Sequence, residues 1–131
     1  MFGNRIDIFS KALDASVIKE KAISNNLANV DTPGYKKVNV SFEDQFRQLL
    51  KANEKTVLKT SHPLHVQPNQ KIDLTPSIEI LNEFTMRNDG NNVDVDTEIS
   101  EQVKNSLYYN ALITNLNSEL RLLQTAITGG R

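Results

Sequence analysis

The chain has 131 residues, enough for one modest domain, and a net charge of −1 with 24% charged residues. Its lysines and arginines are scattered, so it lacks the basic stripe typical of a nucleic-acid-binding protein. Cysteine is absent, which excludes disulfides, zinc thiolate sites and cysteine catalysis. Hydrophobic residues make up 38% and tryptophan is absent, a lean composition that favours burial of apolar surface against partners.

The N-terminal segment lacks the features of a secretory signal peptide. Residues 1–7 have no basic start, no apolar run and no small-residue cleavage site. No apolar run in the chain approaches the ~20 residues of a membrane span. Two locations therefore stay open: the cytosol, or a destination reached by a route that reads no cleaved signal.

A long amphipathic helix is predicted from Ile6 to Asn29. Its apolar residues follow spacings of three and four, or sums of them, and Ser16 and Glu20 interrupt the stripe. The pattern fits either a surface helix packed on its own core or a heptad-like seam that meets other helices. About 25 residues correspond to 37 Å, long for so small a chain. The stripe consists of Ile6, Phe9, Leu13, Ile23, Leu27 and Val30, with Val17 beside it.

The segment Ser24–Lys36 ends this helix and starts an extended stretch. Pro33 has no N–H and disfavours helical geometry at the residue before it. Pro33 and Gly34 fit the two central positions of a type II turn, where glycine accepts a positive φ. Asparagine is a mediocre helix former. Three asparagines near the helix end therefore indicate that side-chain amides are required on that surface. They are Asn25, Asn26 and Asn29.

Residues 36–93 are predicted to form a loosely structured insert that joins the two ends of the chain. A short helix is expected from about Ser41 to Ala52. The segments Ile72–Leu74 and Ile78–Ile80 alternate apolar and polar residues as short strands do, so at most one β-hairpin is expected. Three prolines and many polar residues favour mobile chain elsewhere in the insert.

A second long helix is predicted to start after Asp94 and to end at Gly129–Gly130. Asp94 is the expected N-cap, and Asp96 and Glu98 complement the positive end of the helix dipole. At about 34 residues the helix would span 50 Å. Its apolar stripe contains Tyr109, Ile113, Leu116, Leu120, Leu123 and Ile127, and Ile99, Val103 and Leu107 extend it toward the N-terminus.

The predicted fold is mainly α, with the two terminal helices in an antiparallel, coiled-coil-like hairpin. Residues 1–35 and 94–131 would form one helical core domain, with residues 36–93 as the insert. Two helices in a hairpin can bury only the surfaces between them, so much of each apolar stripe stays exposed in a monomer. This arrangement favours a polymer or a complex.

No catalytic, metal or cofactor site is predicted. The five glycines build neither a phosphate loop nor a dinucleotide fingerprint. His62 and His65 lack a third metal ligand at a recognisable spacing, so exposed loop histidines are the favoured interpretation. The segment Asp89–Glu98 superficially resembles a calcium loop, but two of its ligand positions would hold threonine and arginine. No carboxylate pair lies in an apolar setting suited to acid–base chemistry.

Three segments resemble the flagellar rod and hook family of axial proteins. Ser24–Lys36 is similar to the family's N-terminal signature. Gly90–Glu98, followed by a terminal helix with adjacent tyrosines, resembles the proximal-rod type, as does the short threonine–histidine element Thr60–His65. The length also fits this type, because hook and distal-rod relatives carry larger central domains. The resemblance covers both ends of the chain and only poorly residues 37–84.

The resemblance implies a structural role in the bacterial flagellar basal body. Such proteins are exported unfolded by the flagellar type III apparatus, without cleavage, and form the start of the rod that transmits torque, next to the membrane ring. The implied partners are other rod subunits, further copies of the chain, the export apparatus and the rod adaptor FliE; no nucleic acid, small-molecule substrate or cofactor is implied. By match to the signature, the candidates for shaping the junction of the first helix with its neighbours are Asn25, Asn26, Asn29, Asp31, Pro33, Gly34 and Tyr35. The helix stripes add the candidate assembly residues Leu13, Leu27, Ile113, Leu116, Leu120 and Leu123.

Other functions stay open at this point. Another small flagellar rod protein would share the same signature. A cytosolic helical adaptor or export chaperone would use the same seams to hold a partner's helix. A metal-dependent enzyme built on His62 and His65 is a third alternative, with no further ligand to support it.

Overall fold

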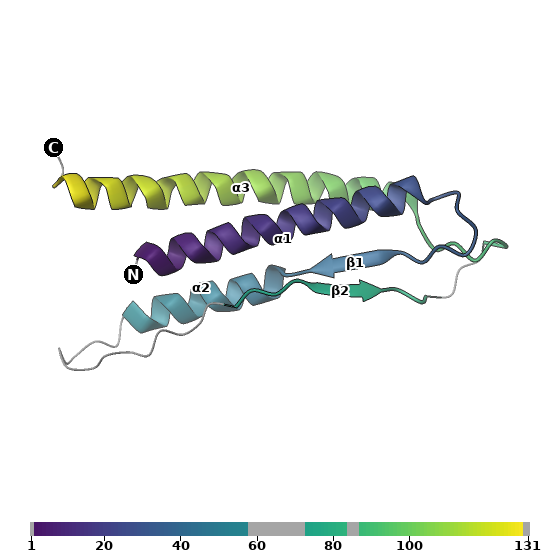
Figure 1. The fold of residues 1–131 in the computed structure, drawn as a ribbon, viewed down its shortest axis with the longest axis horizontal. Helices are drawn as coiled ribbons and strands as arrows, with labels where there is room; N and C mark the ends of the chain where they lie inside the picture. Colours follow the sequence, from purple (N-terminus) through teal and green to yellow (C-terminus); the bar gives the residue numbers. More distant parts are fainter. Residues whose placement is uncertain (1, 58–72, 84–86, 130–131) are drawn as a thin grey trace.

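The computed structural model describes residues 2–57, 73–83 and 87–129. The fold is mainly α, and its two long helices lie side by side and antiparallel, as predicted (Figure 1). The elements, in chain order, are α1 (Phe2–Ala28), β1 (Val38–Ser41), α2 (Glu43–Val57), β2 (Ser77–Ile80) and α3 (Val95–Thr128).

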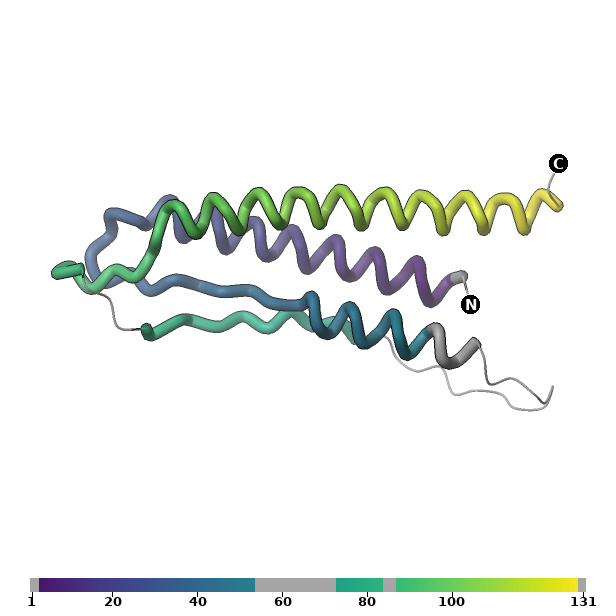
Figure 2. Tube along the Cα trace, turned by 180° about the vertical axis from the view of Figure 1, so that it is seen from behind, coloured from purple at the N-terminus to yellow at the C-terminus, as the bar shows by residue number. Residues whose placement is uncertain are grey.

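The central element is α1, which lies between α3 on one side and the layer of α2, β1 and β2 on the other (Figure 1). Figure 2 shows the same order from behind. The two-stranded layer and α2 therefore cover one side of α1 only. The N-terminus and the C-terminus lie at the same end of the molecule, and the turns after α1 and before α3 lie at the other.

The apolar core forms where α1, α2 and α3 converge. Three edge-to-face aromatic contacts link the helices, with ring centroids 5.7 Å apart for Phe9–Phe46, 5.7 Å for Phe42–Tyr108 and 6.1 Å for Phe46–Tyr108. Burial, reinforced by the nearby Glu43 carboxylate, raises the pKa of Tyr108 to about 12, so its hydroxyl stays neutral. The buried members of the core are Ile8, Phe9, Ala12, Ala15, Phe42, Phe46, Leu74 and Leu112.

Local capping sets the ends of α3 as predicted. The Asp94 carboxylate accepts a hydrogen bond of 3.1 Å from the Asp96 N–H, and Gly129 closes the helix with a φ of 67°. The other boundaries shift modestly. Helix α1 begins at Phe2 rather than Ile6, and α2 ends at Val57 rather than Ala52.

The strand pairing differs from the predicted hairpin. Residues 78–80 form a strand as predicted, but β2 pairs with β1 in antiparallel register, Val40 opposite Ile78. The expected partner segment is not a strand at 73–74, and its residue 72 lies outside the described residues. Val40 is 2% exposed because β1 packs on α1. Packing on a helix, rather than proximity in the chain, therefore selects the pairing.

The buried face of α3 repeats every seven residues and is mostly polar. Asn105 accepts a 2.9 Å hydrogen bond from the Ser16 hydroxyl and donates to the Ser16 carbonyl at 3.1 Å and to Glu20 at 2.9 Å. Arg5 pairs with Glu119 at 2.8 Å. Ser16 and Glu20, which interrupt the predicted stripe on α1, are thus the partners of polar residues on α3. The buried residues of α3 are Glu98, Asn105, Leu112 and Glu119.

The apolar stripe predicted on α3 coincides only in part with the face that α1 buries. Its extension toward the N-terminus is exposed, with Ile99, Val103 and Leu107 at 47%, 55% and 66%. Val103 lies two residues, or about 200°, around the helix from the buried Asn105. The later part of the stripe is half-buried or exposed. The reason is that hydrogen bonds between polar side chains of α1 and α3 determine how α3 is rotated about its axis relative to α1. The apolar pattern of the sequence does not indicate these bonds.

The last turn and a half of α3 projects beyond the start of α1 (Figure 1). Arg5 pairs with Glu119, so Phe2 is level with Leu122 in this antiparallel pair. Residues 123–128 consequently have no part of α1 opposite them.

We expect the amides of residues 123–128 to exchange with solvent at least about tenfold faster than those of residues 105–112 in the isolated protein. An unpacked helical turn is marginal in water, and local opening is easiest there. Hydrogen exchange followed by NMR or mass spectrometry measures this difference. Uniform protection along α3 would contradict the expectation.

Candidate functional site

The candidate site is the end of the molecule where α1 turns into β1 and where α3 begins. We call residues 26–38 and 87–98 together the junction. These two segments are far apart in the chain and lie at the same end of the fold (Figure 1). Side-chain amides, described below, connect these two segments by hydrogen bonds.

Asn26 is the centre of the junction and is 1% exposed. Its amide nitrogen donates to the Val38 carbonyl at 2.8 Å and to the Glu98 carboxylate at 2.9 Å. Its amide oxygen accepts from the Val38 N–H at 2.9 Å and from the Tyr35 hydroxyl at 3.0 Å. All four hydrogen-bonding positions of the side chain are therefore used. One side chain joins α1 to the turn, to β1 and to α3.

Glu98 is a buried carboxylate, with 1% exposure, in the first turn of α3. Such a charge is costly unless it is paired and hydrogen-bonded. The Lys37 ammonium lies 2.6 Å from one of its oxygens, and the Asn26 amide donates to the other. Burial raises the pKa of Tyr35, and the nearby Glu98 charge raises it further. Tyr35 therefore remains a neutral hydrogen-bond donor to Asn26 at physiological pH.

Asn91 binds the turn that follows α1. Its side-chain nitrogen lies 2.8 Å from the Asn29 carbonyl and 2.9 Å from the carbonyls of Val30 and Thr32. Its oxygen accepts from the Val93 N–H at 2.8 Å. The three carbonyls that the fully buried Asn91 binds follow α1 in the turn, so Asn91 holds that turn from a distant part of the chain.

Asn92 and the Gly34 backbone complete the connection. Asn92 accepts from the Lys37 N–H at 2.7 Å and donates to the Leu81 carbonyl at 2.7 Å. The Gly34 N–H donates to the Asp89 carbonyl at 2.7 Å. The junction thus fixes the direction in which the chain leaves α1, and also the place where the layer of β1 and β2 ends.

The turn at Pro33 and Gly34 has the predicted geometry. The Tyr35 N–H donates to the Thr32 carbonyl at 3.3 Å, and Gly34 has a φ of 73°. A Cβ added at Gly34 would meet nothing within 4 Å. The requirement for glycine therefore comes from the backbone conformation and not from crowding.

The junction gathers four of the seven predicted signature residues. Asn26, Asn29 and Gly34 take part in hydrogen bonds that join its two segments, and Tyr35 donates to Asn26 within the first segment. The other three, Asn25, Asp31 and Pro33, are exposed at its surface. Four polar residues that complete the junction were not predicted as site residues, although an Asn–Asn pair directly after an Asp–Gly turn is a recognisable signal. They are Lys37, Asn91, Asn92 and Glu98.

The predicted assembly residues on the helices fall into two groups. Leu13 and Leu116 are half-buried against the core. The others lie farther from it and keep accessible surface: Leu27, Ile113 and Leu123 are half-buried, and Leu120 is 43% exposed.

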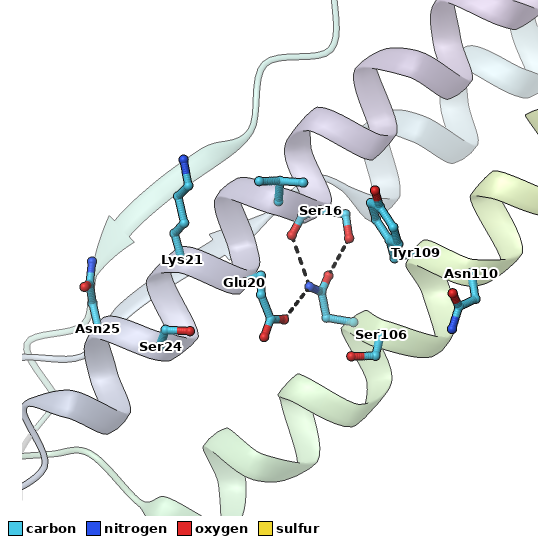
Figure 3. Close-up of a pocket in the computed structure, with 10 residues that line it drawn as sticks. Ser16, Glu20, Lys21, Ser24, Asn25, Ser106, Tyr109 and Asn110 are labelled. Atoms are coloured by element: carbon cyan, nitrogen blue, oxygen red, sulfur yellow. Dashed lines mark hydrogen bonds between the residues drawn. The ribbon is translucent and has the colours of Figure 1, made fainter.

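A groove of about 700 Å³ runs between α1 and α3 (Figure 3). We call it the α1–α3 groove. From α1 it is lined by Val17, Glu20 and Lys21, and from α3 by Ser106, Tyr109 and Asn110. The hydrogen bonds that Ser16 and Glu20 make with α3 cross its floor (Figure 3).

The described part of the chain holds no group of three or more residues suited to bind a metal ion. His62 and His65 lie outside that part. None of the helices within it is long and apolar enough to cross a membrane.

Comparison with known proteins gives a consistent result. The family described as flagella basal body rod protein matches residues 6–36, which cover most of α1 and the turn after it. The flagellar basal body rod protein FlgB of Bacillus subtilis (strain 168) is 36% identical over 131 residues, 100% of this chain and 98% of that protein. The chain belongs to the FlgB family of flagellar basal body rod proteins. Two further FlgB proteins are similar, from Borreliella burgdorferi (33% identical, 89% of this chain and 90% of that protein) and Salmonella typhimurium (30%, 92% and 90%).

This FlgB-family chain is a structural subunit of the flagellar basal body rod, as the resemblance of Ser24–Lys36 predicted. The full-length sequence similarity to FlgB proteins also includes the insert, whereas the family signature does not extend to it. It favours the FlgB type over the other small rod proteins that stayed open.

Gly34→Val is expected to reduce rod assembly more than export of this FlgB-family protein. A β-branched residue at positive φ is strained by about 1–2 kcal/mol or more. The turn would therefore change its conformation, and the chain would leave α1 in a different direction. Export should not be affected, because the protein is unfolded while it is exported. Motility of a complemented deletion strain and the amount of protein outside the cytoplasm are the two measurements. Gly34→Asn is the matched control, because asparagine tolerates this conformation better. Wild-type motility with valine would show that the turn is unimportant.

Proposed function

We propose that this chain forms the proximal part of the rod, next to the membrane ring, and helps to transmit torque. It reaches this place unfolded, through the flagellar type III export apparatus and without a cleaved signal. The full-length similarity to proteins named as basal body rod proteins supports this role. The absence of cysteine is compatible with passage as an unfolded chain.

The observation that carries the proposal is the amount of apolar surface that the helices leave uncovered. Large apolar side chains on both long helices are exposed, among them Val17 at 41%, Leu107 at 66% and Ile127 at 76%. The layer of α2, β1 and β2 covers one side of α1 only. Exposed apolar surface of this extent marks an interaction site. Lateral packing of such helix pairs into a tube would bury it.

In this proposal residues 1–35 and 94–131 carry the surfaces that pack in the rod, and residues 36–93 are an insert whose described part packs against one side of α1. The junction gives every subunit the same angle between the two. Buried polar networks of this kind make a structure rigid, which a torque-bearing part requires. The partners are other rod subunits, further copies of the chain and the adaptor FliE. The role is purely structural, with no substrate, cofactor or nucleic acid.

The test is deletion of the gene followed by electron cryotomography of the cell envelope. We expect membrane rings without a rod, and complete rods after the wild-type gene is returned. Complete basal bodies in the deletion strain would reject the proposal. A cytosolic adaptor or export chaperone would instead be retained in the cytosol and be absent from purified basal bodies.

A further inference from the structure

The outer edge of strand β2 is open in the described part of the chain. The sheet has two strands, and β2 lies on the side of β1 away from α1 (Figure 1). In an antiparallel pair, every second residue directs its N–H and C=O away from the partner strand. The Leu81 N–H donates to the Lys37 carbonyl at 2.9 Å. By alternation, the outward groups are those of Ile78 and Ile80, and no described residue forms a hydrogen bond with them.

The opposite edge of the same sheet is closed by a side chain. On the outer side of β1, the Val38 N–H donates to the Asn26 amide oxygen at 2.9 Å, and the Val38 carbonyl accepts from the Asn26 amide nitrogen at 2.8 Å. Asn26 thus makes the pair of hydrogen bonds that a neighbouring strand would make. Among the described residues β2 has no such closure, and an unpaired strand edge is a template for pairing with another chain.

The side chains of β2 define the kind of strand that fits this edge. Ile78 and Ile80 lie on the same face of the sheet as Val40. They are 61% and 63% exposed, because α1 packs on β1 rather than on β2. Ser77 and Glu79 lie on the other face. A strand added here therefore places apolar side chains beside the two isoleucines and, alternating with them, polar side chains beside Glu79.

The charge around the edge selects a basic partner from another protein. Residues 73–83 contain no lysine or arginine, and none of their three carboxylates forms an ion pair with a described residue. A second copy of β2 would bring like charges together, which disfavours pairing. The described part of this chain offers no free basic strand either, because Lys36 binds the Gly90 carbonyl and Lys37 pairs with Glu98. The three carboxylates are those of Asp73, Glu79 and Glu83.

We propose that the free edge of β2 binds an extended, basic segment of another protein of the basal body by strand addition. The added strand exchanges main-chain hydrogen bonds with Ile78 and Ile80 and places lysine or arginine beside Glu79. In this mode the main chain supplies affinity and alternate side chains supply specificity. A two-stranded sheet is marginal in water, so a third strand also stabilises the layer. The inference rests on the proposed function for the location of the partner, and on the sheet for its chemistry.

A synthetic peptide tests the edge in the purified full-length protein. The probe alternates valine and lysine over a length in the usual range of strands. Its binding is measured by fluorescence anisotropy, and amide exchange of the protein is followed by NMR. We expect the Ile78 and Ile80 amides to exchange at least about tenfold more slowly when the peptide is bound. The same peptide with every backbone nitrogen methylated keeps its charge but loses its donors, and should bind at least about tenfold more weakly.

Ile78→Pro and Glu79→Lys test the same contact from the side of the protein. Proline removes one outward N–H and leaves the ladder to β1, a position at which edge strands tolerate proline. The charge reversal leaves the backbone unchanged. We expect each substitution to weaken binding of the peptide at least about tenfold. Asp7→Lys is the matched control, because it makes the same change of charge at an exposed residue near the start of α1, and should bind as the wild type does.

Three results would each overturn the proposal: no protection of Ile78 and Ile80, equal binding of the methylated peptide, or unchanged binding by Glu79→Lys. These measurements decide the matter even where proline unfolds the layer. Protection that increases with protein concentration in the absence of peptide would also overturn it, since a second copy would then occupy the edge. Failure of the proposed function would appear separately, as absence of the wild-type chain from basal bodies.

Discussion

Asn26→Leu is expected to lower the free energy of unfolding by more than about 3 kcal/mol, because each buried polar group left without its partner costs about 1–3 kcal/mol. Leucine branches at Cγ as asparagine does, but its methyl groups make none of the four hydrogen bonds. The substitution removes a donor from the buried Glu98 carboxylate and the acceptor of the Tyr35 hydroxyl. It also leaves the Val38 N–H and carbonyl without this partner. Urea unfolding followed by circular dichroism measures the change.

Asn25→Leu is the matched control for this experiment. Asn25 is exposed and adjacent in sequence, so we expect a change within about 0.5 kcal/mol, as for most surface substitutions. Equal destabilisation by the two variants would show that helix propensity, and not the buried network, determines the effect. The difference between the two variants therefore isolates the contribution of the junction.

Leu120→Asp is expected to be made and exported but incorporated into rods at less than about a tenth of the wild-type level. Leu120 is 43% exposed in the single chain, so the isolated protein should tolerate the change. In a rod that buries this side chain, loss of a packed leucine costs about 2–5 kcal/mol, and the carboxylate adds a desolvation cost. A loss of about 1.4 kcal/mol already lowers an association constant tenfold. Every subunit carries the defect, so the effect accumulates over the assembly.

The measurement is the amount of each variant in purified basal bodies, divided by the amount released from the cytoplasm. This ratio separates incorporation from expression and export. Ser118→Asp introduces the same charge two residues away, about 200° around α3, and should be incorporated nearly as the wild type. Equal ratios for Leu120→Asp and the wild type would mean that this face points to solvent. The packed-helix rod would then be wrong.

The polar seam between α1 and α3 gives the helix pair a defined register. An apolar seam of the same length would be more stable but would tolerate sliding, whereas a buried polar pair such as Ser16 with Asn105 is satisfied in one register only. The ion pair of Arg5 with Glu119 adds a second fixed point near the other end. A subunit repeated many times in an assembly needs this uniformity more than it needs additional stability.

Features that depend on neighbouring residues followed from the sequence alone. Asp94 caps α3 through an N–H two residues away, and Pro33–Gly34 forms its turn within four residues. The two amphipathic helices, their antiparallel pairing and the family signature at Ser24–Lys36 also belong to this group. Each of these arises from local backbone preference or from an apolar pattern, which is present in the chain before it folds.

Only the tertiary structure decided which polar groups meet. Asn26 reaches Glu98 across 72 positions of the chain, and Asn91 binds the turn after α1 across 62 positions. A polar side chain can be exposed to solvent or buried against a polar partner. Its position in the sequence does not show which of these environments it has. The rotation of α3 depends on the same choice, because Asn105 and Glu119 turn inward only where Ser16, Glu20 and Arg5 receive them. Apolar periodicity therefore predicted the helices, and long-range hydrogen bonding determined their register and the exposed faces available for assembly.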